Sequence, residues 1–267
     1  MLFQIKSYLK FLWYSKNEHA VHSPFVFSLI TKCFYDKKIK KEYAILQEYR
    51  NTLLKNKNSI EVTDFGAGSR IFNSNTRIIA QIAKTAGISP KRAELLYRIT
   101  HYFQPENILE LGTSLGLATS ALALGSRIPT LRDGTKASIV TLEGCSNTMA
   151  IAKKQLQKLN VNNVAFITTE FSAYLTTHNS QLTTHNLIYF DGNHSKKATL
   201  EYFELLLPTI TNDSVWIFDD IHWSVEMEAA WKIIKEHPKV TVTIDTFQWG
   251  LVFFRQEQPK EHFIIRI

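Results

Sequence analysis

The stretch Ile108-Leu-Glu-Leu-Gly-Thr-Ser-Leu-Gly116 decides the fold. Its first four residues form a short apolar run that is typical of a buried strand, and Gly112 permits a sharp turn directly after it. Apolar residues at helical spacing then predict a helix over Ser114–Leu124. A strand, a glycine turn and a helix in this order predict the first unit of a parallel α/β sheet.

The same alternation continues toward the C-terminus. Short apolar runs predict strands at 138–142, 164–167, 186–190 and 214–218, and helical patterns cover 147–159, 196–207 and 225–236. Val240–Phe247 and Leu251–Phe254, joined by a tight turn, predict an antiparallel hairpin at the edge of the sheet. We therefore expect an α/β fold with a Rossmann-like, doubly wound sheet of seven strands, mostly parallel with a C-terminal antiparallel β-hairpin.

Residues 1–100 lack this alternation. Helical patterns there cover 2–14, 25–30, 42–54, 78–86 and 90–99. The segment His22-Ser-Pro24 favours a turn at a helix start, because proline suits the first turn of a helix. We expect a helical N-terminal segment over residues 1–100 and an α/β domain over residues 101–267.

The composition is that of an ordinary globular protein. Of 267 residues, 45% are hydrophobic and 21% are charged, which excludes disordered, collagen-like and disulfide-scaffold chains. No uncharged apolar run approaches the ~18 residues that a membrane-spanning helix needs. Lys6 and Lys10 interrupt the apolar start, which argues against a signal peptide. Cys33 and Cys145 are the only cysteines, and we expect free thiols in a cytoplasmic protein.

Positive charge gathers in the first 100 residues. They carry 17 Lys and Arg against 7 Asp and Glu, a net charge of +10, whereas the remaining residues have a net charge of −3. A basic segment suits nucleic acid, anionic lipid or an acidic substrate. The lysines are scattered among acids and amides, which favours a solvated helical face.

The residues at the strand ends indicate a nucleotide site. Ligands of open parallel sheets bind beyond the carboxyl ends of the strands. Glu143 ends the second strand, where a carboxylate can accept both hydroxyls of a ribose. It lies 31 residues after Gly112, and an inserted loop at 125–137 accounts for the excess over the usual ~20. The dinucleotide fingerprint and the Walker pattern are both absent.

The remaining pattern is E-x-G-x-x-x-G from Glu110 to Gly116, an acid after the second strand and a terminal hairpin. It resembles the class I S-adenosylmethionine-dependent methyltransferases over about residues 108–254. The resemblance implies an enzyme with a methyltransferase domain over 101–267 and a substrate-side cap over 1–100. A Rossmann-like domain for another nucleotide is the alternative.

The resemblance also implies a set of cofactor-binding residues. Glu110 and Gly112 would line the methionine end of S-adenosylmethionine, Glu143 would hold the ribose, and Glu170-Phe171 would contact the adenine. The full set is Glu110, Gly112, Thr113, Ser114, Gly116, Glu143, Gly144, Glu170, Phe171 and Asp191.

A second glycine-rich stretch, Val62-Thr-Asp-Phe-Gly-Ala-Gly-Ser69, also looks like a first methyltransferase motif. No strong helix follows it, and no strand ending in an acid lies within reach. We therefore expect Asp64–Arg70 to form a loop near the mouth of the active site, with Arg70 as a substrate contact. A plain structural turn is the alternative.

Two later strand ends carry several acids, in Phe190-Asp-Gly-Asn-His194 and Phe218-Asp-Asp-Ile-His-Trp223. Carboxylates that lie close together repel one another, and Mg²⁺ or another divalent cation would offset that repulsion. The strand ends are similar to those of catechol and caffeoyl-coenzyme A O-methyltransferases. This implies a metal site at Asp191, Asp219 and Asp220, although Asp220 stands where that family has Asn.

His194 lies three residues after Asp191, where catechol-type enzymes carry a catalytic Lys. Its imidazole suits a general base that takes the proton of a hydroxyl, and the alternative is a helix cap. Asp191 would assist catalysis or orient the cofactor. His222, Trp223 and Trp249 are candidate walls of the substrate pocket, and buried core aromatic residues are the alternative.

Together these features predict methyl transfer from S-adenosylmethionine to a hydroxyl of a small-molecule acceptor. One alternative is an RNA methyltransferase that uses the basic N-terminal segment. The chain lacks the [DN]-P-P-[YF] turn and the Pro-Cys pair that such enzymes use. A second alternative is a non-catalytic cofactor-binding protein on the same fold. A homodimer stays open at this point.

Overall fold

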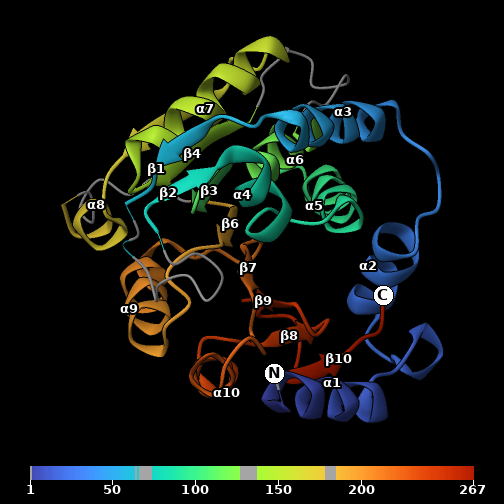
Figure 1. Cartoon of the computed structure of the whole chain (residues 1–267). Coiled ribbons are helices and arrows are strands. Elements are labelled where there is room, and N and C mark those ends of the chain that lie inside the picture. The colour runs from blue at the N-terminus through green and yellow to red at the C-terminus, as the bar shows by residue number, and fades with distance from the viewer. Residues whose placement is uncertain (1, 64, 66–73, 127–136, 178–184) are drawn as a thin grey trace. The chain divides into compact units, whose positions relative to one another are not determined.

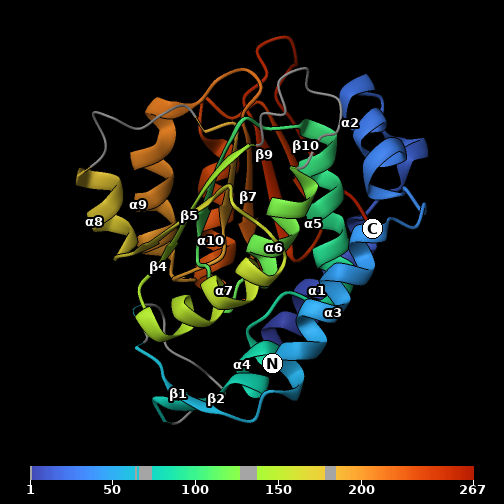
Figure 2. The same ribbon diagram turned by 90° about the horizontal axis from the view of Figure 1, so that it is seen from above.

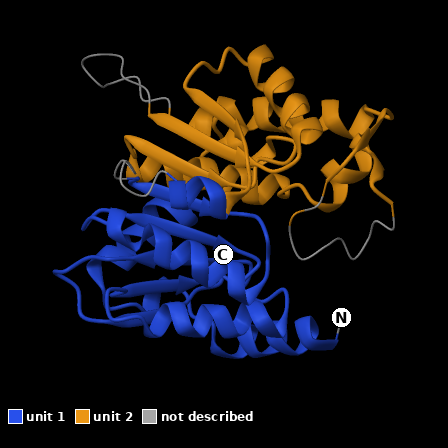
Figure 3. Ribbon diagram, turned by 90° about the vertical axis from the view of Figure 1, so that its left-hand side faces the viewer, with its two compact units in different colours: residues 1–35, 172–267 blue, residues 36–171 orange. Residues whose placement is uncertain are grey.

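The computed structural model describes residues 2–63, 65, 74–126, 137–177 and 185–267. Within them the chain forms two compact units (Figure 3). One consists of residues 36–171, and the other joins residues 1–35 to residues 172–267. Arg70 and most of the expected insertion at 125–137 lie outside the described residues.

The unit of residues 36–171 holds three parallel strands, which are labelled in Figure 1. They are β3 (Asn107–Leu111), β4 (Ser138–Glu143) and β5 (Val164–Thr168), in the order β3-β4-β5. Two helices connect them, α6 (Leu117–Gly125) and α7 (Ser146–Lys158). Every residue of α6 is buried, since leucine and alanine occupy most of its circumference.

Three further helices of this unit precede β3. They are α3 (Lys41–Lys55), α4 (Ile79–Thr85) and α5 (Pro90–Phe103). Helix α3 packs against α4, α5 and α6, and Figure 2 shows α3 beside α5. A short antiparallel pair, β1 (Ser59–Glu61) and β2 (Thr76–Ile78), lies between α3 and α4 in the chain. Helix α8 (Phe171–Thr177) begins at the boundary of the two units.

The other unit holds five strands in the order β10-β8-β9-β7-β6 among its described residues. These strands are β6 (Leu187–Phe190), β7 (Val215–Asp219), β8 (Val242–Asp245), β9 (Trp249–Phe253) and β10 (Glu261–Ile264). Strands β6 and β7 are parallel, as are β8 and β10, whereas β9 runs antiparallel to both β7 and β8. Strands β6 to β9 are buried at every position.

All seven predicted strands are present as β3 to β9, and the mixed, mostly parallel α/β architecture is confirmed. The hairpin was expected at the edge of the sheet. That expectation is wrong, because β10 pairs with β8 and forms the edge instead. Strand β10 escaped detection because it begins with exposed Glu261 and His262, which leave no clear apolar run.

Helices α1 (Leu2–Tyr14), α2 (Pro24–Leu29), α9 (Lys196–Leu206) and α10 (Val225–Glu236) complete this unit. Short helical turns cover Glu18–Ala20, Ile30–Phe34 and Leu207–Thr209. The helix-start turn at His22-Ser-Pro24 is confirmed: the Ser23 hydroxyl accepts a hydrogen bond from the Val26 N–H and Pro24 begins α2. Ser23 also donates to Gln258 Oε1 at 2.9 Å, which ties the start of α2 to the C-terminal segment.

The division into a cap over 1–100 and a domain over 101–267 stays a prediction about function, since the compact units group the residues differently. No helix in the described part of the chain is both long and apolar enough to span a membrane.

Candidate active site

The loop after β3 is shaped by three residues with positive φ. Gly112, Ser114 and Gly116 have φ values of 112°, 48° and 78°, which place them in or near the left-handed region. The N–H groups of Gly112 and Thr113 both donate to the Leu142 carbonyl oxygen, at 3.0 and 3.1 Å. The loop is therefore anchored on β4 before α6 begins.

Glu143, the last residue of β4, joins this loop to the one that follows β4. Its Oε2 accepts the Ser114 N–H at 2.7 Å, and its Oε1 accepts the Cys145 N–H at 2.9 Å. Burial raises the pKa of Glu143 despite these hydrogen bonds, which favour the charged form. The Gly144 N–H and the Thr148 hydroxyl add hydrogen bonds to the same carboxylate, and the side chain is partly exposed at the end of β4.

Glu110 lies beneath the loop and is completely buried. Its Oε2 accepts hydroxyls of Thr119 on α6 and Thr141 on β4, each at 2.6 Å, and Thr113 shares a hydrogen bond with Thr141. Its Oε1 has no hydrogen-bond partner among the described residues. Burial raises the pKa of Glu110 to about 7. Glu110 therefore supports the loop from below and does not face an open surface.

Tyr49 of α3 supports the same loop from the other side. Its hydroxyl donates to the Leu115 carbonyl oxygen at 2.8 Å. A Cβ on Gly116 would lie 2.6 Å from the Tyr49 Oη, so any larger residue at 116 would displace the tyrosine. Burial raises the pKa of Tyr49, which keeps its hydroxyl protonated as a donor. Sequence reasoning missed Tyr49, because it lies 66 residues from its partner with no motif around it.

The segment around β1 packs against the loop after β4. The Glu61 carbonyl oxygen accepts from Asn147 Nδ2 at 2.8 Å and from Cys145 Sγ at 3.7 Å. The ring of Phe65 covers Gly144, where an added Cβ would lie 2.4 Å from it. Phe65 is the one described member of the expected Asp64–Arg70 loop, and the position of the loop stays a prediction.

Glu170 and Phe171 follow β5, and Glu170 is exposed. The N–H of the preceding residue, Thr169, donates to the Glu143 carbonyl oxygen at 3.0 Å. The ends of β4 and β5 are thereby joined within this unit. The other cofactor residues expected from the sequence, apart from Asp191, belong to the same unit.

Asp191 and His194 belong to the other unit, directly after β6. His194 Nε2 lies 3.8 Å from Asp191 Oδ1, and both side chains are partly exposed. The Ser195 hydroxyl accepts the Ala198 N–H and thus caps α9, so a capping role for His194 is wrong. The His194 ring lies 6.0 Å from the ring of Trp223.

The predicted metal site at Asp191, Asp219 and Asp220 is not assembled. Asp219 is buried, its Oδ1 accepts the Asp220 N–H at 2.8 Å, and its Oδ2 accepts the Tyr189 hydroxyl at 3.4 Å. Among the described residues, which include all three aspartates, no group of three or more His, Cys, Asp or Glu side chains is arranged to hold a metal ion.

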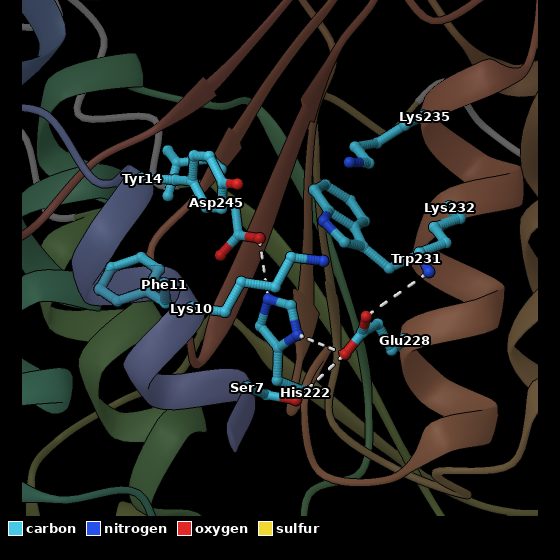
Figure 4. A pocket seen from close by; sticks show the side chains of 11 residues that line it. Ser7, Lys10, Phe11, Tyr14, His222, Glu228, Trp231, Lys232, Lys235 and Asp245 are labelled. Atoms are coloured by element: carbon cyan, nitrogen blue, oxygen red, sulfur yellow. Dashed lines mark hydrogen bonds and ion pairs between the residues drawn. The ribbon is translucent and has the colours of Figure 1, made fainter. Parts of the chain in front are cut away.

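His222 is held between two carboxylates, as Figure 4 shows. Its Nε2 lies 2.8 Å from Asp245 Oδ2 and its Nδ1 lies 3.4 Å from Glu228 Oε2, which also accepts the Ser7 hydroxyl of α1 at 3.1 Å. Burial alone would lower the pKa of His222, but Asp245 and Glu228 outweigh it and the pKa is raised. His222 also stacks on Phe247, with ring centroids 5.3 Å apart.

A cavity of about 350 Å³ opens beside these strand ends. This volume lies within the range of small-molecule sites. It is lined by Gln4, Ile5, Tyr8, Leu9, Asp220, His222, Trp223, Phe247 and Gln248. The structure thus brings together the predicted substrate residues His222 and Trp223 with Asp220. It adds α1 and the turn between β8 and β9, which no sequence motif marked.

Trp249 does not line this cavity. It is 1% exposed within β9, and its ring lies 6.0 Å from that of Tyr189. The expectation that it forms a substrate wall is wrong, because β9 is buried at every position and the Trp249 side chain packs within the core.

A family model described as "Methyltransferase domain" matches residues 109–221, which contain the loop after β3 and the strand ends of β4 to β7. These residues form a methyltransferase domain. The matched region holds Glu110, Gly112, Glu143, Asp191 and Asp219, so the family predicted from the sequence is confirmed for this part of the chain.

Solved structures of methyltransferases share the fold. The SAH-bound methyltransferase PaMTH1 of Podospora anserina has a TM-score of 0.59 and 15% identity, covering 88% of this chain and 97% of its own. An O-methyltransferase of Bacillus cereus in complex with SAH has a TM-score of 0.55 and 17% identity, with coverages of 83% and 94%. The O-methyltransferase TomG of Streptomyces achromogenes, in complex with SAM, has a TM-score of 0.56 and 14% identity, with coverages of 85% and 95%.

At these identities the likeness establishes the fold. No curated protein matches this sequence significantly.

The buried Glu110 of the methyltransferase predicts a pH dependence of folding. A raised pKa means that folded Glu110 keeps its proton between its ordinary value of 4.5 and about 7, while the unfolded chain loses it. The wild-type free energy of unfolding should therefore fall across this window, by a contribution on the order of 3 kcal/mol. In Glu110→Gln this contribution should vanish, as measured by chemical denaturation at a series of pH values. Parallel pH profiles of the two proteins would contradict the assignment.

The clamp around His222 also predicts a loss of stability with rising pH, but in a window that begins at a higher pH. Because the pKa of folded His222 is raised, its protonation stabilises the fold. This contribution to the free energy of unfolding is fully present below the ordinary pKa of 6.5 and is lost as the pH rises through the pKa of the folded state. His222→Gln should therefore cost about 2 kcal/mol in acid and less in alkali, as measured by denaturant unfolding. His237→Gln is a matched control, because burial lowers the pKa of His237 and the difference from wild type should change with the opposite sign.

Proposed function

We propose that the chain transfers a methyl group from S-adenosylmethionine to a hydroxyl of a small-molecule acceptor. The observation that carries the proposal is the partly exposed Glu143 carboxylate, which ends β4 and accepts an N–H of the glycine loop after β3. The family match over residues 109–221 supports methyl transfer. The O-methyltransferases of Bacillus cereus and Streptomyces achromogenes, which share the fold, support oxygen as the acceptor atom.

The residues of the loop fit the nucleoside and amino acid parts of such a cofactor. The Glu143 carboxylate would accept the two ribose hydroxyls, and Gly112 with its neighbours Thr113 and Ser114 would lie along the methionine part. Gly144 and Glu170-Phe171, which end the neighbouring strands, would contact the adenine. Glu110 would support the cofactor site without touching the cofactor, because its carboxylate accepts hydrogen bonds from Thr119 and Thr141 beside the loop.

S-adenosylmethionine, when bound, supplies an electrophilic methyl group on a sulfonium that is a good leaving group. The protein's task is then to align the acceptor oxygen and to receive its proton. We assign the proton to His194, whose imidazole is partly exposed beside Asp191 and Trp223.

His222 is a poorer candidate for the base. Both of its ring nitrogens face carboxylates, which occupy the positions that a substrate hydroxyl would need and raise the pKa of His222. We assign His222 to the wall of the acceptor cavity, together with Trp223 and Asp220.

Calorimetric titration with S-adenosylmethionine and S-adenosylhomocysteine tests the cofactor. We expect micromolar binding of both, unchanged by EDTA, and a loss of about tenfold to a hundredfold in Glu143→Ala, which removes charged hydrogen bonds to the ribose. Glu48→Ala is the matched control, since it removes an exposed carboxylate of α3 and should bind normally. Binding by neither ligand would refute the proposal, and equal binding by Glu143→Ala would refute the role of Glu143.

The base is tested by activity with a panel of phenols and catechols. His194→Ala should lower kcat at least about a hundredfold, while cofactor binding stays unchanged. His22→Ala, which changes an exposed histidine before α2, should retain full activity. An unchanged kcat in His194→Ala would return His194 to a structural role.

A further inference from the structure

Helix α1 carries an apolar stripe that faces solvent. Leu2, Ile5, Leu9 and Trp13 follow one another at intervals of three or four residues and therefore lie on one face of the helix. Their exposed fractions are 77%, 51%, 61% and 83%. We call these four residues the α1 stripe. Contiguous exposed apolar surface of this kind marks an interaction site.

The opposite face of α1 already holds the helix in place. Phe11 is buried, and its ring lies 5.5 Å from that of Phe247. Ser7 is buried as well and donates to Glu228 of α10. The stripe is thus not needed to attach α1, and its exposure does not come from a detached helix.

Positive charge borders the stripe. Helix α1 contains no Asp or Glu, and its two lysines, Lys6 and Lys10, are both exposed. Lys10 also lines a cavity of about 90 Å³ between α1 and α10, together with Lys232 and Lys235 (Figure 4). The acids of this cavity, Glu228 and Asp245, lie against His222, and Glu228 also lies 3.6 Å from Lys232.

We propose that α1 docks on the surface of an anionic phospholipid bilayer. The α1 stripe would enter the boundary between headgroups and acyl chains, and Lys6 and Lys10 would contact the lipid phosphates. A helix with Leu and Trp on its outer face and Lys at the border has the composition of an interfacial helix. At 13 residues α1 is about 20 Å long, too short for the ~30 Å core of a bilayer, so it lies on the surface.

Charge distinguishes a bilayer from a second copy of this chain. Two copies that paired through their stripes would bring together two sets of lysines, with no acid on either helix to offset them. An anionic lipid surface offers phosphates to the same lysines. The observed pattern therefore favours lipid.

Docking would also place the acceptor cavity at the lipid surface. Ile5 and Leu9 belong both to the stripe and to the wall of the cavity of about 350 Å³. A hydroxyl-bearing molecule that partitions into the bilayer would then have a short path to the cavity. The docking itself does not depend on the proposed reaction.

Vesicle co-sedimentation of the full chain tests the proposal. Binding should be at least about tenfold tighter to phosphatidylcholine mixed with phosphatidylglycerol than to phosphatidylcholine alone. The pair Leu2→Gln and Trp13→Gln should weaken binding to the mixed vesicles at least about tenfold, because it removes the inserted side chains that do not line the cavity. The pair Lys6→Gln and Lys10→Gln should lose about fivefold for each charge removed.

Two control variants match these changes. Ile39→Gln removes an apolar side chain that is 92% exposed outside α1, and it should bind vesicles as the wild type does. Lys55→Gln with Lys57→Gln removes the same charge from another exposed segment and should have little effect. Circular dichroism and the unfolding midpoint verify that each variant folds, and the lysine pair tests the proposal if the stripe pair does not fold.

Absence of binding to the mixed vesicles would overturn the proposal, as would equal binding by the folded stripe variant. Sedimentation velocity without lipid tests whether a second copy of the chain binds the α1 stripe instead. A dimer that Leu2→Gln and Trp13→Gln dissociate, together with no vesicle binding, would assign the stripe to a second copy. Because cofactor titration reads a different site, failure of docking and failure of the proposed methyl transfer are distinguishable.

Discussion

The Glu143 carboxylate is the point on which the proposed cofactor site depends. It accepts N–H groups from the loop after β3 and from the loop after β4, so the two strand ends keep a fixed separation. The cost is a charge moved partly out of water, which the raised pKa of Glu143 reflects. Glu110 adds a second buried carboxyl below the same loop, where two threonine hydroxyls support it. Stability is thus given up at the place where a ligand would bind, as is common at functional sites.

In the unit of residues 1–35 and 172–267, two carboxylates lie beside a histidine. His222 lies between Glu228 and Asp245, and through Ser7 the same cluster contacts α1. The N-terminal helix and the residues that follow β7 and β8 are therefore joined by one hydrogen-bonded cluster. Because of this arrangement, α1 lines the cavity of about 350 Å³ that we propose for the acceptor.

The sequence predicted those features that depend on neighbours along the chain. Apolar runs located β3 to β9, and the position of Glu143 at a strand end made it a candidate site residue before any contact was visible. Contacts between distant residues could not be found this way. Tyr49 and Phe65 carry no motif, and nothing in the sequence indicates that the Tyr189 hydroxyl donates to Asp219. The expectation that Trp249 lines the pocket was wrong for a related reason. An aromatic residue beside a turn is equally suited to a pocket wall and to the core.

Helix α1 shows the same limit most clearly. Periodicity predicted a helix over residues 2–14 but could not say which apolar residues would be covered, because apolar residues lie on more than one side of it. The structure covers the side of Phe11 and leaves the side of Trp13 open. The positive charge of the first 100 residues is compatible with binding to nucleic acid, binding to lipid or simple solvation. The structure shows which of these lysines lie beside exposed apolar side chains. Only where lysines border an uncovered apolar stripe do charge and hydrophobic surface favour the same partner, and that partner is an anionic lipid surface.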